Sequence, residues 1–399
     1  MSKGWPLVKL GDVLAEVDTS IPVEKLGTVQ LAGVYSFGRG LFKRGDLNTG
    51  GTSYKKYNRL HTGDFVISQP KAWEGALALV TDEFDGWFLS PVFPTFRCDQ
   101  GKLAPSYLSW WSKQEHVWSS LLFKSRGIGA RRESVSPTEF LSLEIPLPPL
   151  AEQRRLVARI EAVAALVQQA QALRKEIERD LMHLSLAAYR TIVKDSPRSP
   201  LEEVAPLTRR PVIVDATKVY PQISARSFGR GTFYQPPLAG SAITWQKPFE
   251  VRSGDILISN IKAWEGAIAV VKDEDDGRIC SHRYLTCSPK SGISGAFVAY
   301  HLLTEEGLYH IGEASPGSAD RNRTLGTTAL KKIPVPVPST AKQMWFENLL
   351  AQLESTKALQ AETQAELDGL MGAVLGEVFG GQGVRYGEQR SELSVAAEP

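Results

Sequence analysis

Residues 63–86 read GDFVISQPKAWEGALALVTDEFDG, and residues 254–277 read GDILISNIKAWEGAIAVVKDEDDG. The two stretches lie 191 residues apart and agree at 16 of 24 positions. The same offset relates SFGRG at 36–40 to SFGRG at 227–231. Self-similarity at a fixed offset indicates a duplicated structural unit. We therefore expect two similar globular domains, which also suits a chain of 399 residues better than one core.

Each half of the chain has the same order of parts. Short β-branched and aromatic runs, broken by Gly-Asp and Asp-Gly turns, come first and are typical of a mixed α/β or α+β domain. A proline-rich hinge follows, IPLPPLAEQ at 145–153 and VPVPSTAKQ at 335–343. Proline fixes its own φ and disfavours helix in the residue before it, so each hinge is expected to be extended and to lead into a helix.

Apolar residues spaced by threes and fours predict one long helix after each hinge. The two predicted stripes are Leu156, Ile160, Val163, Val167, Ala170, Leu173, Ile177, Leu181, Leu184 and Ala188, and Phe346, Leu349, Leu353, Thr356, Leu359, Leu367, Leu370, Val374 and Val378. A helix of nearly 40 residues is about 60 Å long, too long to bury its stripe in one small domain. We therefore expect an antiparallel coiled coil. The alternative is two independent helices, each packed on its own domain.

The predicted fold class is α+β (mixed α/β), with an internal pseudo-two-fold repeat. The expected domains span 1–143 and 193–332. Hinge and helix segments span 144–192 and 333–380, and a polar tail spans 381–399.

Composition bounds the class of protein without deciding its function. The chain has 46 basic and 44 acidic residues, a net charge of +2, which is low for a protein that coats phosphates nonspecifically. It has no apolar run of membrane-spanning length and no secretory signal, so we expect a cytoplasmic protein with no membrane partner. Three cysteines without a CxxC pair predict reduced thiols.

The nearest approach to a metal-dependent nuclease is an acid followed by an amide and a lysine, which occurs in both copies as Asp64, Gln69, Lys71 and Asp255, Asn260, Lys262. Hard divalent metals prefer carboxylate oxygens, and an amide stands where the second carboxylate is needed. We therefore predict no metal site and expect turns at Gly63-Asp64 and Gly254-Asp255. Glu74 and Glu265 lie close by and keep the nuclease alternative open.

Other catalytic motifs are also broken. LPPL at 147–150 and QPPL at 235–238 lack the first residue and the aromatic of an amino-methyltransferase motif. The G-x-G of each SFGRG lacks the third glycine of a dinucleotide-binding loop. The six histidines form no HxH or HExxH pair, although Cys280, His282 and Cys287 remain an alternative metal site. The sequence predicts no catalytic residue.

Basic and aromatic residues in glycine-rich stretches are candidates for contact with DNA. Arginine forms forked hydrogen bonds with phosphate or guanine, and glycine lets a backbone approach closely. For the basic residues, a solvated basic loop is the alternative, and for the two tryptophans it is packing in the core. The candidates are Arg39, Lys43, Arg44, Lys71, Trp73, Arg126, Arg131, Arg132, Arg230, Lys262, Trp264, Arg321 and Arg323.

PLAEQRRLVARIEA at 149–162, after a first globular half and echoed after a second, resembles the specificity subunits of type I restriction-modification systems. SFGRG followed by KAWEG is similar to one class of their target recognition domains. The resemblance covers about residues 5–380. The second hinge departs from the pattern, because Lys342 stands where the first has Glu152.

The resemblance implies a noncatalytic reader of double-stranded DNA, in which two recognition domains each contact half of a split site and the helices set the gap. Modification subunits, two of them, and restriction subunits would bind alongside and use S-adenosylmethionine, ATP and Mg²⁺. The residues implied in partner binding are Pro148, Pro149, Glu152, Gln153 and Gln343. The likeness of the two halves suggests half-sites in inverted orientation. Alternatives are the recognition subunit of a type IIB-like system, a single-chain nuclease or methyltransferase, and a coiled-coil scaffold without a DNA role.

Overall fold

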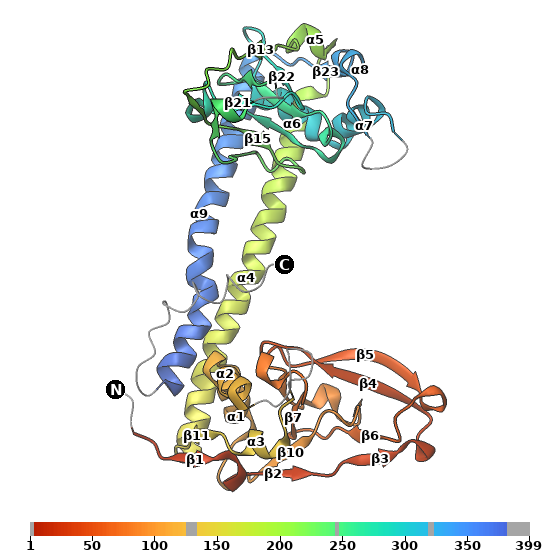
Figure 1. Cartoon of the computed structure of the whole chain (residues 1–399), viewed down its shortest axis with the longest axis vertical. Coiled ribbons are helices and arrows are strands. Elements are labelled where there is room, and N and C mark those ends of the chain that lie inside the picture. The colour runs from red at the N-terminus through yellow and green to blue at the C-terminus, as the bar shows by residue number, and fades with distance from the viewer. Residues whose placement is uncertain (1–3, 125–133, 244–246, 318–322, 381–399) are drawn as a thin grey trace. The chain divides into compact units, whose positions relative to one another are not determined.

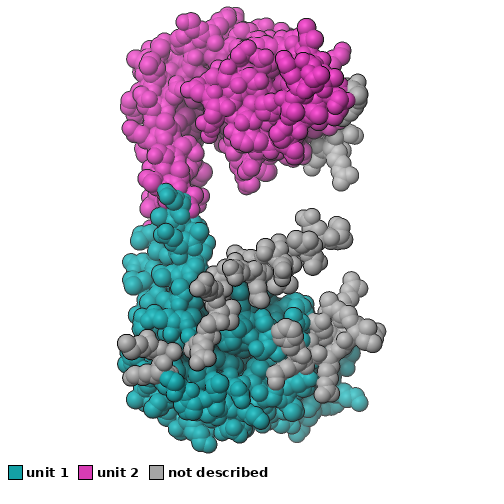
Figure 2. Space-filling model, turned by 60° about the vertical axis from the view of Figure 1, so that its left-hand side comes forward, with its two compact units in different colours: residues 1–173, 362–399 teal, residues 174–361 magenta. Residues whose placement is uncertain are grey.

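The structure is a computed structural model that describes residues 4–124, 134–243, 247–317 and 323–380 (Figure 1). Its contacts divide the chain into two compact units, residues 1–173 with 362–399 (unit 1) and residues 174–361 (unit 2), coloured separately in Figure 2. Two long helices, α4 (Leu150–Val193) and α9 (Thr340–Phe379), contribute residues to both units.

Unit 1 contains three sheets in its described residues, and every strand pair is antiparallel except β4 with β9. In spatial order, the strands are β3 (Ser20–Pro22), β6 (Lys56–Arg59), β9 (Phe88–Leu89), β4 (Thr28–Val34) and β5 (Leu41–Asn48) in the first sheet; β2 (Leu14–Val17), β10 (Thr95–Cys98), β7 (Phe65–Ile67) and β8 (Leu77–Leu79) in the second; and β1 (Leu7–Lys9) and β11 (Glu144–Pro146) in the third. Its shorter helices are α1 (Pro105–Trp111), α2 (Glu115–Lys124), α3 (Pro137–Leu141) and the 3-10 turns η1 (Leu10–Asp12), η2 (Val23–Lys25), η3 (Thr49–Gly51), η4 (Ala72–Glu74) and η5 (Asp82–Phe84).

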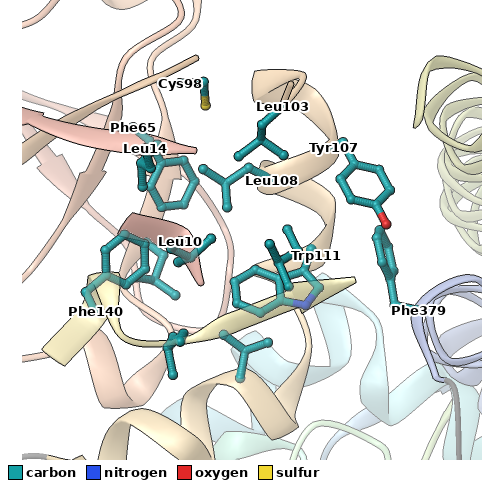
Figure 3. Packing of buried hydrophobic residues seen from close by; sticks show 14 of the residues in the cluster. Leu10, Leu14, Phe65, Cys98, Leu103, Tyr107, Leu108, Trp111, Phe140 and Phe379 are labelled. Carbon is teal, nitrogen blue, oxygen red and sulfur yellow. The ribbon is translucent and has the colours of Figure 1, made fainter. Parts of the chain in front are cut away.

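The core of unit 1 lies between the second sheet, the short helices and the long ones. All three residues of β7 are buried, which matches a continuous apolar run rather than an alternating one. Phe140 of α3 packs against Phe65, with ring centres 6.0 Å apart (Figure 3). It also packs against Phe96, with ring centres 5.0 Å apart. Tyr107 of α1 contacts Phe379 of α9 at 5.1 Å, so the end of α9 belongs to this core.

Unit 2 repeats the plan, but smaller sheets stand where unit 1 has its five-stranded sheet. In spatial order, its strands are β20 (Ile268–Val270), β19 (Ile256–Ser259) and β22 (Tyr284–Cys287); β13 (Arg210–Pro211), β18 (Phe249–Glu250) and β21 (Ile279–Cys280); and the pairs β12 (Arg198–Pro200) with β23 (Pro334–Pro336), β14 (Val219–Tyr220) with β17 (Leu238–Ala239), and β15 (Ser224–Ala225) with β16 (Thr232–Phe233). Its shorter helices are α5 (Leu201–Val204), α6 (Gly295–Leu303), α7 (Glu305–Glu313), α8 (Thr327–Lys331), η6 (Gly240–Ala242), η7 (Ala263–Glu265) and η8 (Asp273–Asp275).

Strand register confirms the predicted duplication. Phe65 pairs with Leu79 in unit 1, and Ile256 pairs with Val270 in unit 2, an offset of 191 at both positions. The hinges also correspond, since β1 pairs with β11 as β12 pairs with β23. The clearest difference is the long β4–β5 hairpin, whose counterpart in unit 2 is interrupted and forms two separate two-residue pairs, β14–β17 and β15–β16. The mixed α+β class with two similar sheet-rich units is therefore confirmed.

Each hinge is extended, as proline predicts, and the long helix begins directly after it. Helix α4 has 44 residues and α9 has 40. The start of α4 packs with the end of α9 in the core of unit 1, where Ile160 and Val374 share one cluster. The end of α4 packs with the start of α9 in unit 2, where Tyr189 and Phe346 share another. The helices are therefore antiparallel, as predicted.

The predicted stripes need one correction, because they are not buried along their whole length. Leu156 and Ile160 are buried, but Leu173, Ile177 and Leu184 are exposed. On α9, Leu359 and Leu370 are also exposed. Only the ends of the stripes reach the cores of the two units, and a two-helix seam covers fewer faces than a domain core does.

A buried histidine joins α4 to the rest of unit 2. His301 is fully buried on α6, and its Nδ1 lies 2.6 Å from the Tyr189 hydroxyl, while Nε2 lies 3.0 Å from the carbonyl oxygen of Pro334. A carbonyl only accepts, so Nε2–H donates to it and Nδ1 accepts from the tyrosine. Burial lowers the pKa of His301 below its ordinary 6.5.

Unit 2 is therefore expected to lose stability as the pH falls below about 6.5. There the unfolded chain binds a proton at His301 that the folded unit does not bind, and the free energy of unfolding falls by up to about 1.4 kcal/mol per pH unit. Urea unfolding at pH 7.5, 6.5 and 5.5 measures this change. His301→Asn, which does not titrate, is the control, and an equal slope in both proteins would contradict the assignment.

Candidate nucleic-acid interface

The two repeated motifs of unit 1 fold against each other. The backbone N–H of Phe37 donates to the carbonyl oxygen of Glu74 at 2.8 Å, and that of Gly38 donates to Gly75 at 2.9 Å. The Glu74 carboxylate accepts from the Ser36 hydroxyl at 3.1 Å and from Lys71 Nζ at 2.6 Å. SFGRG, between β4 and β5, and KAWEG, around η4, thus form one element, which we call the SFGRG–KAWEG element.

Unit 2 builds the same element with the same bonds. Phe228 N–H donates to the carbonyl oxygen of Glu265 at 2.7 Å, and Gly229 donates to Gly266 at 2.9 Å. The Glu265 carboxylate accepts from Ser227 at 2.9 Å and from Lys262 at 2.5 Å. The Lys262 hydrogen bond holds the pKa of Glu265 below its ordinary value. The sequence identity of the two motifs is therefore explained by their mutual contacts.

Glycine is required where the motifs touch helices. Gly75 has φ +79°, and a Cβ there would lie 2.4 Å from the indole of Trp118 on α2. Phe37 and Phe228 share this left-handed region, with φ 64° and 63°, although they are not glycines. The two residues are 63% and 71% exposed, so each unit presents a phenylalanine to solvent from an unusual backbone conformation.

The tryptophans of the two KAWEG motifs are half-buried, so each indole packs on the core and also has a face at the surface. The Nε1–H of Trp73 donates to Pro70 and that of Trp264 to Ile261, at 3.1 Å and 3.3 Å. Both indoles pack against the core clusters of their units. The ammonium of the motif lysine lies 5.1 Å from the ring centre in unit 1 and 5.2 Å in unit 2.

Several predicted cations gather at the same element. Arg39 is exposed, with Nε donating to the carbonyl oxygen of Ser36 at 3.0 Å and its guanidinium 4.7 Å from the ring centre of Tyr35. Arg230 lies over Phe228 at 5.5 Å, and Arg323 lies over Trp264 at 5.2 Å. The structure therefore brings Arg39 together with Lys71 in unit 1, and Arg230 and Arg323 with Lys262 in unit 2, around repeated aromatics.

Other candidates lie away from this element or outside the described residues. Lys43 on β5 is exposed and pairs with Glu83 at 2.8 Å, while Arg44 lines a cavity of about 260 Å³ beside Tyr54. Neither has a basic counterpart, because positions 234 and 235 are Tyr234 and Gln235. The candidates outside the described residues are Arg126, Arg131, Arg132 and Arg321.

Sequence reasoning missed the aromatic supports of the element. Tyr35 stacks on Phe42 with ring centres 4.3 Å apart, and in unit 2 Arg226 lies over Phe233 at 5.5 Å. These positions correspond at offset 191, so Tyr35 is replaced by Arg226 beside an otherwise identical motif. This difference between the two halves is visible in the sequence and is the signal that could have pointed to these positions.

The nuclease-like residues are not assembled into a site. Asp64 is buried at the predicted turn and accepts two hydrogen bonds from Arg97, at 2.7 Å and 2.9 Å, whereas Lys71 is bonded to Glu74. Asp255 is equally buried but pairs with Arg210 at 2.6 Å. Both aspartates thus hold structural ion pairs, which a motif search misses because the partners lie far away in sequence.

Among the described residues, no group of three or more His, Cys, Asp or Glu side chains is placed to hold a metal ion. Cys280 and Cys287 lie in different core clusters, and burial raises the pKa of each thiol to about 12. Within the described part of the chain, no helix combines the length and the apolar character that a membrane span requires.

The hinge residues proposed for partner binding divide by exposure. Gln153 is fully buried; it accepts from Ala104 N–H and donates to Lys102 and Pro148, each at 2.8 Å. Gln343 is also buried and repeats this arrangement with Ser294 and Pro338. These amides, with buried Pro148, fasten the helix starts to their own units and expose no surface for a partner. Pro149 is exposed and Glu152 is partly exposed, so partner binding stays a prediction for these two residues.

Comparison with solved structures shows the fold. The HsdS subunit from Thermoanaerobacter tengcongensis matches 96% of this chain and 98% of its own, with a TM-score of 0.59 and 20% identity. A chain from a structure of a type I restriction-modification system matches over 95% and 98%, with a TM-score of 0.68 and 21% identity. No family model and no curated protein matches the sequence. The chain shares its fold with these proteins over nearly its whole length.

Proposed function

We propose that this chain, which has the fold of the specificity subunits of type I restriction-modification systems, is itself such a subunit. In this proposal, it reads a split site in double-stranded DNA with its two units and has no catalytic residue of its own. Modification subunits, two per complex, would methylate adenine with S-adenosylmethionine, and restriction subunits would cleave with ATP and Mg²⁺. The observation that carries the proposal is the duplicated SFGRG–KAWEG element, which gathers exposed cations and aromatics once in each unit of this fold.

Phosphate contacts and base contacts need different side chains, and the element offers both. Arginine and lysine neutralise phosphates and bind guanine, while exposed aromatic rings can stack on bases or contact thymine methyl groups. The parts that are identical in both units suit features common to any half-site. The parts that differ, such as Tyr35 against Arg226 and Arg44 against Gln235, suit bases that distinguish the half-sites. The half-sites are then related but not identical.

Methylome sequencing tests the proposed function in the cell. Deleting the gene from its host is expected to remove N6-methyladenine from one split motif, and re-expressing the full chain is expected to restore it. A methylome that does not change would contradict the proposal. Unrelated half-sites in the motif would contradict only the inverted-repeat hypothesis.

The alternatives give different results with purified components. A single-chain nuclease or methyltransferase would act on DNA with Mg²⁺ or S-adenosylmethionine and no other subunit. A scaffold without a DNA role would protect no sequence in a footprint. A type IIB-like recognition subunit would copurify from its host with a fused nuclease-methyltransferase rather than with separate subunits.

A further inference from the structure

Phe37 and Phe228 are the only residues other than glycine with positive φ in the described part of the chain. They occupy the same position in the two copies and differ by one degree in φ. Both residues are largely exposed, and the Phe37 ring makes an edge contact with the ring of Trp118, with centres 6.2 Å apart. The same strained, exposed aromatic is thus built twice.

The fold itself does not need a phenylalanine at this position. The element is held by the backbone N–H of the residue, which any amino acid other than proline supplies. Glycine would adopt this φ without the Cβ clash that penalises an L side chain in the left-handed region. The exposed ring also contributes little apolar burial. A strained residue that folding does not require is a candidate for a functional one.

The surroundings of each ring suit a nucleic-acid base beside its phosphate. The Arg39 guanidinium lies 6.0 Å from the Phe37 ring centre, and that of Arg230 lies 5.5 Å from Phe228. Each element contains one acidic residue, Glu74 in unit 1 and Glu265 in unit 2. Its carboxylate accepts hydrogen bonds from the lysine and the serine of the same element. An anionic backbone can therefore approach, and a flat apolar ring is presented for stacking.

We propose that Phe37 and Phe228 are wedge residues, each of which inserts at a base step of one half-site and stacks on an unstacked base. Exposed apolar side chains that enter base steps kink or unstack the duplex, and stacking on an aromatic tolerates any base. The two wedges would then supply binding and deformation common to both half-sites, and the neighbouring differences would supply sequence discrimination. This inference rests on the proposed function.

The test compares Phe37→Gly and Phe228→Gly with the wild-type chain, assembled with its host's modification subunits on a duplex carrying the motif from methylome sequencing. The base 2-aminopurine, placed at successive positions, fluoresces more strongly where it is unstacked. We expect Phe37→Gly to abolish the rise at one step of one half-site and Phe228→Gly to abolish it in the other. Each variant should also bind about tenfold more weakly, while its melting temperature is unchanged or higher.

Phe37→Trp is the matched control, since it keeps a large ring at the same strained position. It is expected to retain the fluorescence rise and most of the affinity. Equal affinity and fluorescence in wild type and Phe37→Gly would overturn the wedge while leaving the reading function intact. A lower melting temperature with loss of DNA binding in both variants would indicate a folding role and also overturn it.

Two further results would overturn the wedge in other ways. Loss of the modification subunits on purification of Phe37→Gly, with an unchanged DNA response, would assign the ring to a protein partner. If the wild-type complex bound no DNA sequence, the proposed function would fail together with the inference.

Discussion

Arg97→Ser is expected to destabilise unit 1 by about 2–4 kcal/mol, because it leaves a buried carboxylate without its cationic partner. The Asp64 side chain is 2% exposed, and its carboxylate accepts two hydrogen bonds from the guanidinium of Arg97. The estimate lies below that for a fully buried pair because half of the Arg97 side chain reaches solvent. Water can therefore compensate for part of the lost interaction.

Adding Thr19→Arg to Arg97→Ser is expected to recover most of that stability. Position 97 corresponds to Ser288 in unit 2, and position 19 corresponds to Arg210. The strand register supports this match. In unit 1 the carbonyl oxygen of Thr19 accepts a hydrogen bond from the backbone N–H of Arg59, and in unit 2 Arg210 is the strand partner of Glu250. Both residues of the second pair lie 191 positions after those of the first. In unit 2, the guanidinium of Arg210 donates to the Asp255 carboxylate. The Ser288 hydroxyl donates a further hydrogen bond to the same carboxylate at 2.7 Å.

Urea unfolding followed by tryptophan fluorescence measures both effects, since six of the nine tryptophans lie in residues 1–173. Thr19→Arg alone is the control and should change stability little while Arg97 is present. If the double variant unfolded as easily as Arg97→Ser, the proposed equivalence of the two arginine positions would be incorrect.

Inserting seven residues into both long helices, after Leu173 and before Glu362, is expected to change the recognised spacer. Seven residues lengthen a helix by about 10.5 Å, which corresponds to about three base pairs. The bases within each half-site should stay the same, because the insertions lie where the two units divide. Affinity for the original site should fall by about a thousandfold or more, toward nonspecific binding.

Selection of bound duplexes from a random pool, followed by sequencing, identifies the spacer directly. Insertion into α4 alone is the control; it mismatches the antiparallel pairing with α9 and should give no defined new spacer. If the doubly lengthened chain still selected the original spacer, the length of the helices would not determine the spacing of the half-sites.

Much of the fold could be predicted because it is encoded by repetition and periodicity. The offset of 191 gave two similar units, and the hinges at 145–153 and 335–343 gave the starts of the long helices. Which stripe residues are covered could not be predicted, because Leu173 and Ile177 satisfy the helical spacing as well as Ile160 does. Their exposure depends on which core reaches that part of the helix, and this is a property of tertiary packing.

The candidate site was predictable in its residues but not in its assembly. SFGRG and KAWEG stand as separate motifs in the sequence, and only the fold shows that Glu74 accepts hydrogen bonds from Ser36 and Lys71. The positive φ of Phe37 could not be anticipated, because no local preference favours it in a bulky residue. Gln153 and Gln343 were expected at a partner surface, and burial gives them an internal role instead.

The exchanged positions of the two arginines restrict how the gene can recombine with itself. The stretch at 63–86 lies between positions 19 and 97, and the stretch at 254–277 lies between the equivalent positions 210 and 288. The two stretches are similar enough to invite crossover between the two halves. A chimera that joined Thr19 to Ser288 would inherit a buried carboxylate with no arginine, and the reciprocal product would carry both. Inheritance of whole halves avoids this conflict, so viable reshuffling should favour breakpoints outside residues 19–97 and their counterparts.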